Sequence, residues 1–346
     1  LRQPGSTFKL FVYLTALKEG MKPERVLRDS ARCFRGYCPR NFGNRYMGNV
    51  PMWVALQNSL NVVAVALLQE LGFDKVIDTA KSLGIGVTRP LGRFYPMAIG
   101  AYEQTVLEMT AAYAALFNRG VYVKPTPFEE ILGPDGQLLW SRRVNGDPGK
   151  RAVASDIADA MVWMLQQVVK GGTGTGAALS DRPVAGKTGT SEGGRDLWFI
   201  GGIPQLATGV WLGYDDSRET RSTSVVATYA WQSFMAPIVK ELPVRQFPPK
   251  PELTGTYVRD RKPEAKQPAG RTRWWPQEPV ESRWQPPPTA DTETPPPRSS
   301  QPATSSGAAA GSGTAAPAAA PAAAPPTPAA PPTAPPPPVI APPPPV

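Results

Sequence analysis

The sequence predicts an α+β fold built around one small antiparallel sheet. Apolar helical patterns dominate the chain up to about residue 170, and strand patterns rich in Trp, Phe, Ile and Val follow them. No internal repeat is present. Helices that precede the strands, instead of alternating with them, favour segregated α and β regions. We therefore expect an antiparallel sheet of three strands, flanked by helices.

The first helix is expected to be buried nearly all round. Residues 6–19 leave few polar positions on this segment, and Pro4-Gly5 interrupts the chain directly before it. Ser6 is then expected at the helix N-terminus, where free N–H groups and the helix dipole favour a developing alkoxide. Residues 21–51 are rich in turn formers and are expected to be largely irregular.

The later helices are marked by apolar periodicity and by their start and stop signals. Thr105 and Glu108 form a capping box, with the Glu three residues after the N-cap Thr. Ser155 is the expected cap of the last helix before the sheet. The expected helices span residues 53–58, 62–71, 73–83, 105–117, 155–170 and 226–242.

The strand patterns begin after a glycine-rich loop at residues 171–176. Residues 184–190 are expected to form a short strand that leads into a turn. Residues 196–203 and 206–214 are rich in Trp, Phe, Ile and Val and are separated by a Pro-Gln turn, which predicts an antiparallel hairpin.

Composition divides the chain of 346 residues at about residue 245. Residues 1–245 have the composition of a folded domain. Residues 246–346 are basic and rich in Pro and Ala, so they cannot bury enough apolar surface to offset their ordering entropy and are expected to be disordered. Much of the excess charge behind the formal net value of +9 falls in or near this tail, interleaved with Trp. A solvated basic linker is the simpler interpretation of that pattern, and we expect no nucleic-acid partner.

The absence of His narrows the chemistry. Ser-His-Asp catalysis, Cys-His pairs and His-based zinc sites are excluded within this chain, so any general base must be Lys, Asp or Glu. Cys33 and Cys38 are the only cysteines, which is too few ligands for a zinc site. Their spacing is compatible with a short-loop disulfide and equally with two free thiols.

Ser6-Thr7-Phe8-Lys9 places a hydroxyl and an amine one helical turn apart. A neutral Lys9 can take the proton of Ser6 and make it a nucleophile for an acyl carbon. An ordinary Lys has a pKa of about 10.4 and is protonated at neutral pH. Burial and a second nearby cation lower such a pKa, and Lys187 is the cation that the sequence offers.

A second motif, Ser59-Leu60-Asn61, falls at the joint between two expected helices. Ser59 can relay a proton to a leaving amine, and Asn61 can hold a substrate amide. Many polar helix joints look similar, so this motif gains its meaning only beside the others.

The third motif, Lys187-Thr188-Gly189-Thr190, lies on an expected strand. Thr188 and Thr190 can hydrogen-bond a substrate carboxylate while Lys187 adds positive charge. Gly189 lets a ligand backbone approach the strand closely. The backbone N–H groups of Ser6 and Thr190 are candidates for an oxyanion hole.

In this order the three motifs resemble the Ser-x-x-Lys, Ser-x-Asn and Lys-Thr-Gly elements of penicillin-binding proteins and serine β-lactamases. The flanking residues resemble the transpeptidase domain of class A, bifunctional penicillin-binding proteins, over about residues 1–245. One departure is Ser191, where the family usually has Thr. The segments that carry the resemblance are residues 2–9, 11–17, 55–61, 108–114, 186–190, 196–201 and 211–215.

The resemblance implies a penicillin-binding and serine β-lactamase-like fold and a D,D-transpeptidase that needs no metal or organic cofactor. The donor would be a peptidoglycan stem peptide ending in D-Ala-D-Ala, which acylates Ser6 and releases the terminal D-Ala. An amine on a neighbouring stem would accept the acyl group, and β-lactams would trap the same Ser6. The alternatives are a D,D-carboxypeptidase, a β-lactamase-type hydrolase with Glu103, Glu108 or Glu192 as second base, or a class B transpeptidase.

The resemblance also implies that the sequence is N-terminally truncated. In the family a membrane anchor, a glycosyltransferase domain and the first strands of the sheet precede this domain. We therefore expect a domain on the extracytoplasmic, periplasmic side of the plasma membrane, and a piece that folds poorly and risks inactivity on its own. Composition favours an inert linker for the tail; the alternative is a polyproline II spacer or docking segment for a cell-wall, divisome or elongasome protein.

Overall fold

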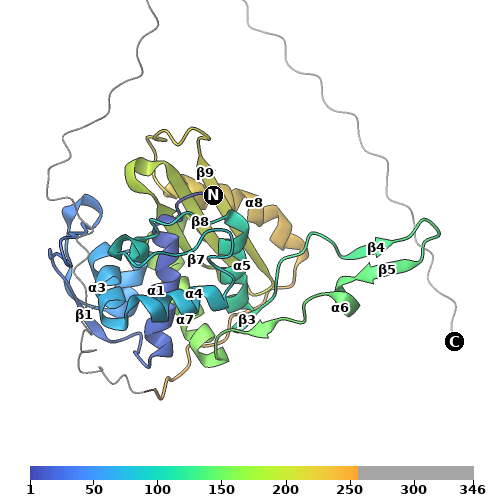
Figure 1. The fold of residues 1–346 in the computed structure, drawn as a ribbon, viewed down its shortest axis with the longest axis horizontal. Coiled ribbons are helices and arrows are strands. Elements are labelled where there is room, and N and C mark those ends of the chain that lie inside the picture. The colour runs from blue at the N-terminus through green and yellow to red at the C-terminus, as the bar shows by residue number, and fades with distance from the viewer. Residues whose placement is uncertain (256–346) are drawn as a thin grey trace, which may run out of the picture. The chain divides into compact units, whose positions relative to one another are not determined.

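The computed structural model describes residues 1–255, which belong to one compact unit. Helices surround a three-stranded antiparallel sheet, so the predicted α+β class is confirmed (Figure 1). The disorder expected for the tail falls almost entirely on residues outside the described part.

The helices follow most of the predicted ranges. They are α1 (Lys9–Lys18), α2 (Met52–Gln57), α3 (Asn61–Leu71), α4 (Phe73–Ser82), α5 (Val106–Phe117), α6 (Arg142–Asn145), α7 (Ser155–Gly171) and α8 (Val225–Ile238). Short 3-10 turns are η1 (Gly5–Phe8), η2 (Phe42–Asn44), η3 (Tyr95–Ile99), η4 (Thr175–Ala177), η5 (Glu192–Gly194) and η6 (Val239–Glu241). The capping box of α5 is present, with Thr105 and Glu108 bonded to each other's backbone N–H.

The strands of the central sheet are those that the sequence predicts. They are β7 (Ala185–Thr190), β8 (Asp196–Ile203) and β9 (Leu206–Gly213), in the order β7-β8-β9. The other strands form two-stranded pairs: β1 (Val26–Asp29) with β2 (Gly48–Pro51), β3 (Val121–Tyr122) with β6 (Lys150–Arg151), and β4 (Glu130–Leu132) with β5 (Leu138–Ser141). The β1–β2 pair and η2 lie within residues 21–51, and the rest of that region is irregular, so the expectation of a largely irregular region is confirmed.

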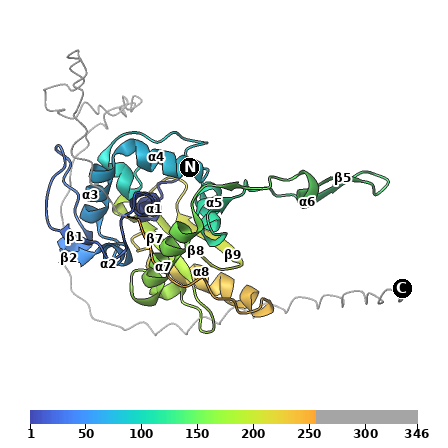
Figure 2. The same cartoon turned by 90° about the horizontal axis from the view of Figure 1, so that it is seen from below.

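Both faces of the central sheet are covered, because side chains of β8 alternate between two cores. Trp198 and Ile200 belong to the larger core, with residues of α1, α3, α5 and α7. Leu197 and Phe199 belong to a smaller core with Trp231 of α8. Figure 2 shows α5 and α8 on opposite sides of the sheet.

Helix α1 runs through the larger core and is buried from Lys9 to Leu17, as the sequence predicts. Ser6 does not start this helix. It lies in the 3-10 turn η1, because Gly5 has a φ of +52° and turns the chain sharply before the α-helix begins at Lys9. The predicted helix start at Ser6 is therefore corrected by one turn.

Two other sequence-based expectations are settled by the structure. Helix α7 begins at Ser155 with Ala154 at its N-cap and no side-chain cap bond, so the predicted capping role of Ser155 is wrong. Cys33 and Cys38 form a disulfide in the loop between β1 and β2, which decides the alternative left open by their spacing.

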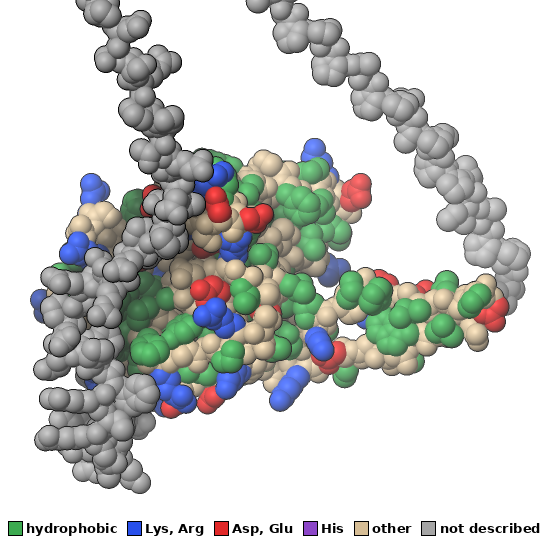
Figure 3. All heavy atoms as spheres, turned by 45° about the horizontal axis from the view of Figure 1, so that its top comes forward, with side chains coloured by type: hydrophobic (Ala, Val, Ile, Leu, Met, Phe, Trp, Pro, Cys, Tyr) green, Lys and Arg blue, Asp and Glu red, His purple; other side chains and the backbone are tan. Residues whose placement is uncertain are grey.

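The β4–β5 hairpin projects away from the domain as an arm (Figures 1 and 2). Apolar side chains lie along its surface in the space-filling view (Figure 3). The exposed apolar side chains of the arm include Ile131, Leu132, Leu138 and Leu139.

The folded part of the chain reaches beyond residue 245. Phe247 stacks against Phe117, with ring centroids 5.5 Å apart, and it and Leu253 are only 8% exposed in the larger core. Lys250 pairs with Glu24. This segment, residues 246–255, is rich in Pro, and composition alone therefore placed it with the tail. Its two buried apolar side chains, Phe247 and Leu253, nevertheless pack it against the domain.

We predict that ending the chain after Arg245 destabilises the domain, whereas ending it after Gly255 does not. Loss of two buried side chains should lower the melting temperature by on the order of 10 °C. Leu253→Ala in the longer chain should give part of that loss, and Val244→Ala, at an exposed position, should give none. Equal melting temperatures for the two chain ends would show that the segment adds nothing to stability.

Candidate active site

Two lysine side chains converge on one hydroxyl. Lys9 at the start of α1 and Lys187 in β7 are both fully buried. Lys187 Nζ donates to Ser59 Oγ at 2.9 Å, and Lys9 Nζ donates to the same oxygen at 3.2 Å. Ser59 lies between α2 and α3. The structure thus joins side chains from all three sequence motifs in one network.

Lys9 Nζ has an acceptor for each of its N–H groups. Besides Ser59 Oγ, it donates to Ser59 O at 2.6 Å and to Asn61 Oδ1 at 2.6 Å. In neutral Lys9 the two carbonyl oxygens can hold its two remaining N–H groups and leave the lone pair for a hydroxyl. The structure therefore anchors Lys9 on the Ser59–Asn61 segment, whereas helical spacing alone suggested Ser6 as its partner.

The backbone of Ser59 is strained. Its φ is +57°, in the left-handed region that non-Gly residues seldom adopt. The Ser59 N–H donates to Leu56 O at 3.0 Å, and its carbonyl accepts from Lys9. Such strain persists only where the surroundings fix it, and it clusters at functional sites. Here it turns the carbonyl and the hydroxyl of Ser59 toward the same amine.

Asn61 is held at both ends of its amide. Oδ1 accepts from Lys9, and Nδ2 donates to Arg40 O at 2.7 Å. One amide N–H and one oxygen lone pair remain for a substrate. Helix α3 begins at Asn61 with no cap from the preceding Leu60. Asn41 replaces that cap, because its Oδ1 accepts from the backbone N–H of Asn61 at 2.8 Å and of Val62 at 3.2 Å.

Asp29 holds this remote cap in place. Its carboxylate accepts from Asn41 Nδ2 at 2.8 and 3.0 Å and from the Met47 N–H at 2.8 Å, and the residue is only 1% exposed. Sequence reasoning missed Asn41 and Asp29. One signal was available: the first N–H groups of a buried helix need acceptors, and Leu60 cannot supply one.

Burial lowers the pKa of both lysines. Desolvation brings the pKa of Lys187 to about 7. Desolvation is also the largest cause for Lys9, the charge of Lys187 adds to it and Asp29 opposes it, and the pKa of Lys9 ends well below its ordinary value. Lys187 thus acts on Lys9 in the way that the sequence motifs suggested. Because two adjacent buried charges repel, the pair favours a state in which only one of the two lysines is protonated.

The hydroxyls of β7 differ in their surroundings. Thr188 is buried, and its Oγ1 lies 2.6 Å from Thr173 Oγ1 and 3.3 Å from Lys187 Nζ. Thr173 comes from the glycine-rich loop after α7, which the sequence analysis did not connect with the site. Thr190, at the end of the strand, is exposed.

The glycine of the third motif is approached by the chain itself. A Cβ on Gly189 would lie 2.4 Å from Pro4 O, and a Cβ on Gly5 would lie 2.6 Å from Thr190 O. This contact gives Gly189 a role within the chain, because the backbone of Pro4 needs the room. The interpretation that Gly189 also lets a ligand backbone approach stays a prediction. The same contact brings Ser6, the residue after Gly5, to the end of β7 beside Thr190.

The carboxylates considered as a second base are engaged elsewhere. Glu103 forms an ion pair with an arginine. Glu108 accepts hydrogen bonds from Thr88 and Thr105, and Glu192 is exposed in η5. In the described part of the chain, the hydrogen bonds of the lysine network go to none of these groups.

The arrangement can be compared with known families. The sequence profile of the penicillin-binding protein transpeptidase domain matches residues 2–228. The chain belongs to this family. Among its relatives is penicillin-binding protein 1A of Aquifex aeolicus, which is 34% identical over 261 residues, 73% of this chain and 35% of the relative. Penicillin-binding protein 1A of Neisseria gonorrhoeae is 32% identical over 248 residues, 68% of this chain and 31% of the relative.

These relatives confirm the resemblance to class A penicillin-binding proteins, and the chain spans about a third of their length. Solved structures agree on the fold. The penicillin-binding protein PonA1 of Mycobacterium tuberculosis has a TM-score of 0.68 at 24% identity, with 74% of each chain covered. The D,D-transpeptidase domain of a peptidoglycan glycosyltransferase from Eggerthella lenta has a TM-score of 0.60 at 25% identity, covering 70% of this chain and 67% of that one.

Residues 1–255 contain neither a cluster of metal-binding side chains nor a membrane-spanning helix. No group of three or more His, Cys, Asp or Glu residues is placed to hold a metal ion. None of the described helices combines the length and the apolar character needed to cross a membrane.

We predict that two substitutions move the pKa of Lys9 in opposite directions. Asp29→Asn removes the negative charge that raises this pKa, so the pKa should fall; Lys187→Met removes the positive charge that lowers it, so the pKa should rise. Lys9 is protonated as the pH drops through its pKa, which an NMR titration of lysine labelled with ¹³C at the ε-carbon follows directly. Lys9→Arg identifies the signal. Shifts in the same direction in both variants would indicate a loss of packing and contradict the electrostatic account.

Proposed function

We propose that this domain is a D,D-transpeptidase that cross-links peptidoglycan through an acyl-enzyme on Ser6. The observation that carries the proposal is the buried network in which Lys9 and Lys187 meet at Ser59, next to the backbone contact that sets Ser6 beside Thr190. The relatives give support: one is named a D,D-transpeptidase domain, and PonA1 of M. tuberculosis has been solved in complex with penicillin V.

Acylation begins with neutral Lys9, which receives the proton of Ser6. The Ser6 oxygen attacks the carbonyl carbon of the penultimate D-Ala. The backbone N–H groups of Ser6 and Thr190 stabilise the oxyanion. The proton passes from Lys9 through Ser59, whose hydroxyl contacts both lysines, to the leaving amine. The C–N bond breaks, D-Ala departs, and the acyl group stays on Ser6 as an ester.

Deacylation reverses the proton path. An amine of a neighbouring stem peptide attacks the ester, Ser59 and Lys9 take its proton, and the Ser6 oxygen leaves with a proton.

Charged Lys187 and the hydroxyls of Thr188 and Thr190 attract the carboxylate of the donor peptide. Asn61 offers its remaining N–H or lone pair to the peptide amide. Gly189 serves this arrangement by admitting Pro4 and thus Ser6 to the strand.

A hydrolase is the alternative within the same fold. A β-lactamase needs a second base that activates water against the ester. Glu103 and Glu108 have other partners and Glu192 is exposed. In the described part of the chain none of the three accepts a hydrogen bond from the lysine network, so no specific contact favours that alternative. A D,D-carboxypeptidase would share the acyl-enzyme and differ only in its acceptor. A class B transpeptidase fits less well, because the relatives are named penicillin-binding protein 1A.

The rest of the protein enters the proposal through its relatives, of which this chain matches about a third. A glycosyltransferase domain and a membrane anchor would precede the domain, which would act on the periplasmic face of the plasma membrane. Its partners would be peptidoglycan stem peptides and β-lactams. Residues 256–346 lie outside the described part, and their docking to a cell-wall, divisome or elongasome protein remains a prediction from composition.

We predict that fluorescent penicillin forms a covalent adduct with the chain and that Ser6→Ala abolishes it. Lys9→Met should slow adduct formation by at least about a hundredfold, because general base catalysis contributes that much. Ser82→Ala, on α4 at an exposed site, is the matched control and should label at the normal rate. The measurement is fluorescence of the denatured protein on a gel, with mass spectrometry of the labelled peptide.

The lifetime of the adduct separates the alternatives. A transpeptidase should hold the penicilloyl ester for many minutes in water, whereas a β-lactamase releases it and turns over. Labelling at a residue other than Ser6, or rapid turnover by the unmodified chain, would contradict the proposal.

A further inference from the structure

The segment that leads to Ser6 is packed against backbone on two sides. A Cβ on Gly5 would lie 2.9 Å from Thr190 N, and a Cβ on Gly100 would lie 2.1 Å from Gly5 O. Gly5 N–H donates to Gly100 O at 3.3 Å. No side chain fits between these strands of backbone, so the position of the Ser6 amide relative to the Thr190 amide depends on how this segment is held.

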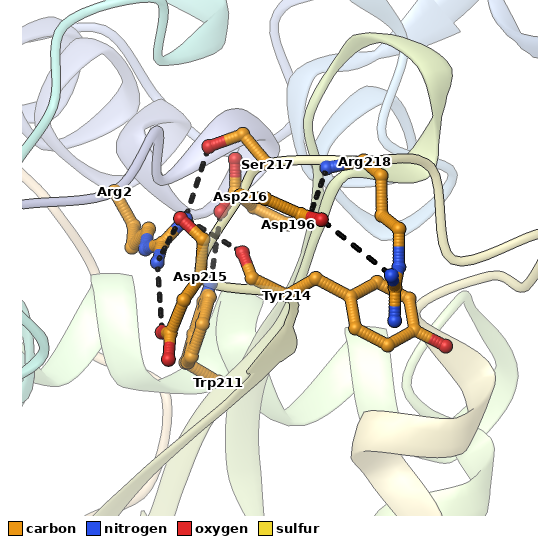
Figure 4. Close-up of polar contacts among 8 residues, drawn as sticks. All are labelled: Arg2, Asp196, Trp211, Tyr214, Asp215, Asp216, Ser217 and Arg218. Carbon is orange, nitrogen blue, oxygen red and sulfur yellow. Dashed lines mark hydrogen bonds and ion pairs between the residues drawn. The ribbon is translucent and has the colours of Figure 1, made fainter.

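Arg2 fastens the segment at its start. Its backbone exchanges hydrogen bonds of 3.0 and 2.9 Å with Gln104. Its guanidinium donates to Tyr214 O at 3.0 Å and to Ser217 Oγ at 3.1 Å, in the loop after β9. The same guanidinium stacks on Trp211, with Cζ 4.5 Å from the ring centroid (Figure 4).

Trp211 continues the connection to the other side of the site. Its Nε1 donates to Asp196 Oδ1 at 3.0 Å. The second carboxylate oxygen, Oδ2, accepts from Ser191 Oγ at 2.9 Å, and Asp196 N–H donates back to Ser191 Oγ at 2.8 Å. Asp196 and Ser191 are each 7% exposed. Ser191 directly follows Thr190, so the series of contacts begins four residues before Ser6 and ends one residue after Thr190.

We propose that Arg2, Trp211, Asp196 and Ser191 form a clamp that sets the spacing between the amide N–H groups of Ser6 and Thr190. The inference rests on the proposed function, in which these two amides form the oxyanion hole. The four residues are positioning residues, since they act on the two amides through the segments that carry those amides.

The site needs such a clamp because Ser6 lies in a short 3-10 turn and Thr190 is the last residue of an edge strand. η1 has only four residues. β7 pairs with β8 alone within the described sheet, so its other edge lacks the support of a neighbouring strand. Two donors must converge on one oxygen within about 3 Å, and a misplacement of about 1 Å can cost a hundredfold in rate.

The contacts of the clamp differ in how much they are expected to stabilise it. Asp215, which pairs with Arg2 at 3.3 Å, has a fully exposed side chain, and exposed ion pairs contribute little. The stack places the guanidinium of Arg2 on the aromatic face of Trp211, and the Asp196–Ser191 bonds are buried, so these contacts should carry the effect. The test therefore addresses Trp211 and Ser191.

The experiment separates binding of fluorescent penicillin from acylation by stopped flow. Trp211→Phe keeps the ring under Arg2 but removes the donor to Asp196, and Ser191→Ala removes the hydroxyl. Each should lower the acylation rate constant by on the order of tenfold, with the dissociation constant of the initial complex changed less than about twofold. Ser191→Thr, which keeps the hydroxyl, should restore the rate.

Arg218→Met is the matched control. Arg218 lies in the same loop, bonds Asp216 and stacks 3.8 Å from the ring centroid of Tyr214, whereas Arg2 bonds the backbone carbonyl of Tyr214 (Figure 4). Its acylation rate constant should equal that of the unmodified chain. An unchanged rate constant in both Trp211→Phe and Ser191→Ala, or an equal loss in Arg218→Met, would overturn the clamp.

An NMR measurement judges the clamp without penicillin. The amide signals of Ser6 and Thr190 should move in Trp211→Phe and stay in place in Arg218→Met. Amide signals that do not move in Trp211→Phe would also overturn the clamp. If the unmodified chain melts cooperatively but forms no adduct at Ser6, the proposed function fails, while the movement or constancy of these two signals still decides whether the clamp exists.

Discussion

Two buried lysine side chains share the hydroxyl of Ser59, and the surrounding structure is arranged to make that contact tolerable. Transferring an ammonium group out of water costs several kcal/mol even after relaxation, and a second one beside it adds repulsion. The domain meets this cost in two ways. Lys9 and Lys187 have depressed pKa values, so that one of them is neutral near pH 7. Each Nζ also has several oxygen acceptors within hydrogen-bond distance.

These acceptors have to be fixed by elements outside the motifs. Ser59 presents both of its oxygens to Lys9 only because its backbone stays in the left-handed region. That conformation precedes α3, whose first N–H groups are capped by Asn41, which Asp29 holds in turn. Asp29 therefore has two effects through one carboxylate: it orients the cap of α3, and its charge opposes the loss of the proton from Lys9.

The sequence alone was sufficient to predict those parts of the structure that have a periodic or local residue pattern. Residues 196–203 were predicted as a strand with the bounds that β8 has, because bulky side chains fill both of its faces. The capping box of Thr105 and Glu108 is local and could be found in the same way. Asn41 could not be found in this way, because it lies in a turn-rich region and caps a helix that begins twenty residues later in the chain. The close approach of Pro4 to Gly189 is equally invisible, because glycine on a strand has the same sequence pattern whether a ligand or the chain itself comes near.

The same approach explains why the site has two independent requirements. The lysine network fixes protonation through side chains on α1, β7 and the segment before α3. Backbone contacts at the edge strand β7 fix the amides of Ser6 and Thr190. In the described chain, the side-chain hydrogen bonds of Lys9 and Lys187 do not involve these two amides. A change in the clamp around Arg2 should then alter the rate of acylation without altering the pH at which Lys9 becomes a base. A change at Asp29 should do the reverse, as long as Asn41 keeps its cap on α3. Charge and geometry at this site are thus set by different groups: the side chains of Lys9 and Lys187 set the charge, and backbone contacts between η1 and β7 set the geometry.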